Sequence, residues 1–178
     1  MGTYFPRSTN EIRSDEPSAL RALTRSVLEI GLITGIVLRF FRSLVLTHGS
    51  NSWLYLGGMF AVGAVFLFAM STLHLANFPL RRWLWRAPAL GVLVAAGEAA
   101  ASLFLIAVGR EPSGTVRAEL ADWPGMAVSL LLFRLTAVCA WALVLAGAVT
   151  VARNALAATR RKAETPQPGS MPRPRATA

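Results

Sequence analysis

Cysteine, histidine and acidic side chains are scarce in this sequence. Cys139 is the only cysteine, so the chain has no internal disulfide, no CxxC redox pair and no cysteine-based zinc site. The two histidines, His48 and His74, fall near opposite ends of the predicted spans and cannot clamp one haem within the chain. The motifs of metalloproteases, serine hydrolases and phosphate-binding loops are also missing. We therefore expect a protein that is not an enzyme.

Apolar residues arrive in long blocks instead of the short periodic patterns of a soluble domain. Hydrophobic residues make up 54% of the chain, and about 20 apolar residues are needed for a helix to cross the ~30 Å hydrocarbon core of a bilayer. The sequence predicts an all-α integral membrane protein with four transmembrane helices in an antiparallel bundle. The expected spans are 27–47, 53–76, 87–108 and 126–151. The first contains Glu29, Arg39 and Arg42, so an interfacial amphipathic helix is the alternative there.

Polar segments flank the four predicted spans. We expect a polar tail over 1–25, a transmembrane domain over 26–152, and a basic, Pro-rich, flexible tail over 153–178. A helix is expected to begin near Pro17 or Ser18 and to continue into the first span.

Basic residues predict the orientation, because short cytoplasmic loops collect Lys and Arg. Both termini and the segment between the second and third spans are rich in Arg, whereas the other two loops are not. Both termini are therefore predicted to be cytoplasmic. The net charge of +9 follows from this topology and does not call for nucleic acid. The basic group at 159–162 could also hold anionic lipid headgroups. The excess of Arg over Lys and the abundance of Ala are typical of GC-rich bacterial genomes, so we expect a protein of the bacterial cytoplasmic (inner) membrane. The thirteen basic residues assigned to the cytoplasmic side are Arg7, Arg13, Arg21, Arg25, Arg81, Arg82, Arg86, Arg153, Arg160, Arg161, Lys162, Arg173 and Arg175.

Three charged residues fall deep within three different predicted spans. Counting 1.5 Å per residue from the predicted borders places Glu98 at roughly 16 Å, and Arg134 and Arg39 at roughly 18 Å, from the cytoplasmic face. A charged group costs about 2.5–3.5 kcal/mol at this depth, so it should face the bundle interior and find a partner. We predict a Glu98–Arg134 pair, with Arg39 either joining it or extending toward the interface with Arg42. The acidic residues of the loop before the fourth span, Glu111, Glu119 and Asp122, are interpreted as solvated.

Small residues predict where helices meet, because helices in lipid associate by close backbone approach. Gly31 and Gly35 form a GxxxG pattern in the first span, and Gly91 and Ala95 give the third span a comparable pair.

Three functions are compatible with this pattern. We expect a non-catalytic accessory subunit that packs against the transmembrane helices of a partner protein. The alternative is a small oligomeric transporter or ion-coupled permease that uses Glu98 and Arg134. The third is a pigment-, haem- or quinone-associated subunit in which His74 is the cofactor ligand. No cofactor is required by the sequence.

Overall fold

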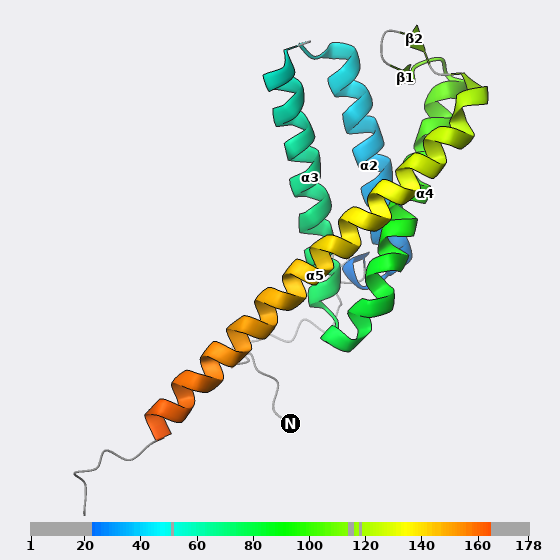
Figure 1. The fold of residues 1–178 in the computed structure, drawn as a ribbon. Helices are drawn as coiled ribbons and strands as arrows, with labels where there is room; N and C mark the ends of the chain where they lie inside the picture. The colour runs from blue at the N-terminus through cyan, green and yellow to red at the C-terminus, as the bar shows by residue number, and fades with distance from the viewer. Residues whose placement is uncertain (1–22, 51, 114–115, 118, 165–178) are drawn as a thin grey trace, which may run out of the picture. The chain divides into compact units, whose positions relative to one another are not determined.

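Four long apolar helices make up most of the described structure. The computed structural model describes residues 23–50, 52–113, 116–117 and 119–164. Its helices are α2 (Val27–His48), α3 (Trp53–Ala76), α4 (Trp83–Ala107) and α5 (Trp123–Glu164), and each is long and apolar enough to cross a membrane (Figure 1). The predicted all-α class with four spans is therefore confirmed, and the fold is that of a multi-pass membrane protein.

Short elements connect these helices. The 3-10 helices η1 (Leu80–Arg82) and η2 (Leu120–Asp122) lead directly into α4 and α5. Between α4 and η2, the two-residue strands β1 (Pro112–Ser113) and β2 (Val116–Arg117) pair antiparallel.

Helices α4 and α5 are longer than the sequence predicts. Helix α4 begins at Trp83, directly after η1, and includes Pro88 as its sixth residue. Helix α5 continues to Glu164, so the prediction of an irregular tail from 153 onward is wrong for 153–164. That stretch contains no Gly or Pro and is rich in Ala and Arg, which favour helix. The rest of the predicted tail, 165–178, lies outside the described residues.

The helical backbone is interrupted at Ser26, immediately before α2. Residues 23–25 are helical, but Ser26 has an extended backbone (φ −78°, ψ 113°), and its hydroxyl accepts a hydrogen bond from the Glu29 N–H at 3.3 Å. Serine is a preferred N-cap for this reason. The predicted continuous helix into the first span is therefore wrong at Ser26, and its expected start at Pro17 or Ser18 lies outside the described residues.

Helices α2, α3 and α4 pack around a common apolar core, and the contact between α2 and α4 is the most extensive. The chain forms two compact units that meet after Ala142. The C-terminal part of α5, 143–164, belongs to the second unit. Every side-chain cluster described below lies in the first unit. The core consists of Ile30, Leu38, Leu67, Leu75, Ala87, Leu90, Val94, Val138 and Ala142.

Candidate functional site

Glycines bring the backbones of α2 and α4 into direct contact. A Cβ atom added to Gly35 would overlap the Val94 carbonyl oxygen and lie 2.8 Å from the Glu98 nitrogen. One added to Gly97 would overlap the Leu32 carbonyl oxygen. The seam between α2 and α4 therefore has no room for side chains at these positions, which is the close approach that small residues permit in membranes.

The four small residues expected to mediate packing all lie at helix contacts or in the core. A Cβ on Gly31 would lie 2.5 Å from the Leu93 Cβ, and Gly35 lies at the crossing just described. Gly91 serves a different pair of helices, because its Cβ would lie 2.9 Å from the Leu135 Cα on α5. Ala95 is buried.

Arg39 forms a buried ion pair with Glu111 on one side of the seam. The Arg39 Nη2 contacts Glu111 Oε1, its Nε donates to Oε2 at 3.3 Å, and Nη2 also donates to the Ser102 hydroxyl at 3.1 Å. Arg39 and Glu111 are only 3% and 2% exposed. The charge in α2 is therefore neutralised by a residue that follows α4, and a hydroxyl of α4 completes the site.

The end of α4 explains how Glu111 reaches this position. Gly109 has a positive φ of 65°, its N–H bonds to the Ile106 carbonyl, and the Arg110 N–H bonds to the Leu105 carbonyl. These are the two hydrogen bonds of a Schellman cap, in which a glycine turns the chain back along the helix it ends. The next residue, Glu111, is thereby directed toward α2.

Two sequence interpretations are corrected by this pair. Glu111 is not part of a solvated loop, and Arg39 neither bonds directly to Glu98 nor extends to the interface with Arg42. The Gly109 cap was the one signal in the sequence for this arrangement, because it marks a chain reversal two residues before a carboxylate.

Glu98 and Arg134 form the second ion pair, between α4 and α5. The Arg134 Nε donates to Glu98 Oε1. The structure therefore brings together the two residues that we paired in the sequence because they lie at similar depths. Glu98 is fully buried, and its Oε2 has no hydrogen-bond partner. The close contact at Gly91 holds α5 near enough for this pair to form, because it involves the backbone of Arg134 and Leu135.

The three charged residues that lie within the helices, Arg39, Glu98 and Arg134, begin at similar levels. Arg39 is nine residues from the end of α2 and Glu98 nine residues from the end of α4, which is about 13 Å in each case. Arg134 is eleven residues into α5, or about 16 Å from its start. All three residues therefore start from the middle third of a helix, where an unpaired charge is most costly, and each is paired.

His74 lies in a separate cluster and has both ring nitrogens occupied. Its Nδ1 lies 2.9 Å from the Thr24 carbonyl oxygen, and its Nε2 lies 3.3 Å from the Arg86 Nη1. A carbonyl requires a proton on Nδ1, which leaves Nε2 as the acceptor for Arg86. The Arg86 guanidinium also stacks on the Phe78 ring, 3.4 Å from its centroid. His74 thus has no nitrogen available for a metal in this arrangement, and it connects the segment before α2 to α3 and α4.

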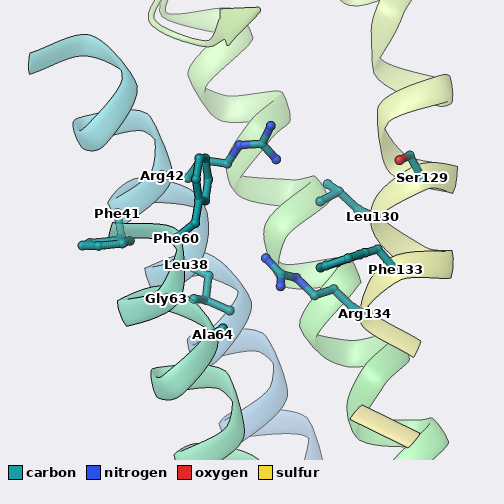
Figure 2. A pocket seen from close by; sticks show the side chains of 10 residues that line it. All are labelled: Leu38, Phe41, Arg42, Phe60, Gly63, Ala64, Ser129, Leu130, Phe133 and Arg134. Atoms are coloured by element: carbon teal, nitrogen blue, oxygen red, sulfur yellow. The ribbon is translucent and has the colours of Figure 1, made fainter. Parts of the chain in front are cut away.

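An open cleft lies beside the ion pairs, between α2 and α3 on one side and α5 on the other. Figure 2 shows the guanidinium groups of Arg42 and Arg134 pointing into it. Its volume is about 400 Å³. A second hollow of about 350 Å³ shares Arg42, Ser129 and Leu130 with it and extends to Arg39 and Pro112. The residues that line the first cleft are Leu38, Phe41, Arg42, Phe60, Gly63, Ala64, Ser129, Leu130, Phe133 and Arg134.

Metal-ligating side chains and similarity to known proteins were the two remaining indications of function for the ion pairs and the cleft. Among the described residues, no group of three or more His, Cys, Asp or Glu side chains could hold a metal ion. Comparisons with protein-family models, curated proteins and solved structures gave no match to this chain.

Proposed function

We propose that this protein is a non-catalytic accessory subunit that packs against the transmembrane helices of a partner membrane protein. The observation that carries the proposal is the outward face of α3. This helix is the least buried of the four. A Cβ at Gly57 or Gly58 would meet nothing within 4 Å, whereas Gly31, Gly35, Gly91 and Gly97 all lie at contacts between helices.

Glycines on an open helix face are informative in a membrane. A lipid-facing position gains nothing from glycine, which lowers helix stability by about 1 kcal/mol relative to alanine. A helix interface does gain, because glycine allows close backbone approach. Gly57, Gly58 and Ala61 are exposed together within one turn of α3, so they favour contact with a helix from outside the chain.

The buried charges support a structural role as well. Arg39 pairs with Glu111, and Arg134 pairs with Glu98. Each interaction joins two different segments and fixes their register. In a subunit whose task is to present a defined outer surface, such pairs hold the helices in place without taking part in chemistry.

The test is native mass spectrometry of the tagged full chain after gentle detergent extraction from its membrane. We expect co-purification with a larger membrane protein, and loss of this complex in Gly58→Leu. The matched control is Leu73→Phe, which enlarges another exposed α3 side chain (53% exposed) away from the glycines. A monomer, or a complex that Gly58→Leu leaves intact, would contradict the proposal.

The cleft favours a second candidate function, a small oligomeric transporter. Arg134, the partner of Glu98, lines this cleft, and ionisable groups beside an intramembrane cavity often line ion pathways. Proton flux into liposomes under an imposed potential tests it. A transporter predicts flux by the wild type that Glu98→Gln abolishes, and a homo-oligomer without other subunits.

We further propose that both termini lie in the cytoplasm of a bacterial cell, with the protein in the cytoplasmic membrane. The excess of Arg in the two terminal segments and in the loop at Arg81 and Arg82 supports this orientation. Green fluorescent protein fused to the C-terminus should fluoresce, whereas an alkaline phosphatase fusion there should be inactive. The reverse pattern would place the C-terminus outside.

A further inference from the structure

Arg42 differs from the two other arginines at the cleft because no carboxylate of the described residues forms an ion pair with it. Arg39 and Arg134 each contact a glutamate. Within the described residues, no hydrogen bond or salt bridge of Arg42 is found, and its guanidinium lies over the Phe60 ring, 5.9 Å from the centroid. The cleft with its adjoining hollow is therefore lined by three guanidinium groups, which only two glutamates balance.

The position of Arg42 makes this imbalance significant. Arg42 is six residues from the end of α2, or about 9 Å along the helix axis. A guanidinium at this level gains little from the hydrocarbon around it and is stabilised by an anion. Arg134 adds to the attraction, because only its Nε bonds to Glu98 and its guanidinium also points into the cleft (Figure 2).

The remaining walls define what such an anion carries. Apolar surface on both sides of the cleft comes from Phe41, Phe60, Leu130 and Phe133. Toward the β1–β2 end the lining becomes polar, with Arg39 and Ser129. A small hydrophilic anion would meet the apolar walls unfavourably, whereas an amphiphile would place its charge on Arg42 and its chain along the phenylalanines.

We propose that this cleft is a binding site for one anionic phospholipid, whose phosphate contacts Arg42 and whose acyl chain extends deeper along Phe133. The charge complementarity, the polar-to-apolar gradient and the location within the spans together favour a lipid over a soluble anion. Arginine suits this role because its planar N–H donors match the oxygens of a phosphate. The cleft uses Phe60, Gly63 and Ala64 of α3, which neighbour the residues of the proposed partner surface but are not part of it.

Native mass spectrometry with added lipid tests the site. The full chain, purified in detergent, is titrated with dioleoyl phosphatidylglycerol, with dioleoyl phosphatidylcholine, and with inorganic phosphate. We expect one phosphatidylglycerol per chain, weaker occupancy by phosphatidylcholine, and none by phosphate. Arg42→Gln should weaken phosphatidylglycerol binding about tenfold, as for the loss of one charge-assisted hydrogen bond, and Arg42→Lys should restore part of it.

The matched control is Arg81→Gln, which removes an exposed arginine of η1 outside the cleft. It should leave the affinity unchanged, and circular dichroism should show the same helix content in all variants. Equal binding by Arg42→Gln and wild type, or equal occupancy by the two lipids, would overturn the proposal. Saturable binding of inorganic phosphate would replace the lipid with a soluble anion.

Discussion

Removing the charge of Glu111 should destabilise the protein far more than its position in a short loop suggests. In Glu111→Gln the Arg39 guanidinium stays buried and keeps only Ser102 and one amide oxygen as acceptors. Removing one partner of a buried ion pair costs about 3–5 kcal/mol. Because the amide retains one acceptor, we expect the lower end, about 3 kcal/mol, or roughly a hundredfold change in the unfolding equilibrium.

Unfolding in mixed micelles of increasing SDS content, followed by tryptophan fluorescence, measures this difference. The matched control is Glu29→Gln, the same chemical change at an exposed site in the first turn of α2, which should stay within about 0.5 kcal/mol of wild type. The double variant Arg39→Met/Glu111→Gln should recover much of the loss, because it leaves no buried charge unpaired. The single variant Arg39→Met completes the comparison. The reasoning is refuted if Glu111→Gln is as stable as the control, or if the double variant loses as much stability as Arg39→Met and Glu111→Gln lose in sum.

Three further substitutions test the contacts around this pair by the same unfolding assay. Gly35→Ala should lower the free energy of unfolding by about 1–3 kcal/mol, because the added Cβ would overlap the α4 backbone. Gly58→Ala has open space around it and should be neutral or slightly stabilising. Equal effects of the two substitutions would argue against the close contact between α2 and α4. Gly109→Ala should cost about 1–2 kcal/mol, because alanine disfavours the positive φ of the Schellman cap, and a neutral result would show that this turn does not hold Glu111. His74→Phe should cost about 1–3 kcal/mol, because the phenyl ring cannot accept the hydrogen bond from Arg86. The wild type should carry no haem absorption, and a haem bound through His74 would contradict its structural role.

The sequence was sufficient to predict the four spans and the approximate level of the buried charges. Hydropathy fixes span length through the thickness of the bilayer, and a constant rise per residue converts sequence position into depth. The same arithmetic paired Glu98 with Arg134, since both sit on consecutive helices at one level.

The Arg39–Glu111 ion pair could not be predicted in this way, because it depends on the conformation of the loop after α4, which hydropathy does not describe. Glu111 follows the end of α4 and, by sequence position alone, belongs to a solvated loop. Only the backbone reversal at Gly109 places it beside Arg39. The environment of His74 was equally hidden, because its partner Thr24 lies 50 residues away.

The long continuation of α5 was missed for a different reason. Polarity was taken as the mark of an irregular tail, yet 153–164 is polar and still made of strong helix formers. Helix propensity decides local structure there, since no apolar face is needed to continue a helix that has already formed.

The most direct test of the accessory role is photo-crosslinking in the native membrane from position 61 of α3, beside the two open glycines. A photoreactive amino acid replacing Ala61 should form one discrete adduct with another membrane protein, whereas the same group at Val37, exposed on α2, should react with lipid. Crosslinking to lipid alone from position 61 would contradict the proposal that this face binds a partner helix.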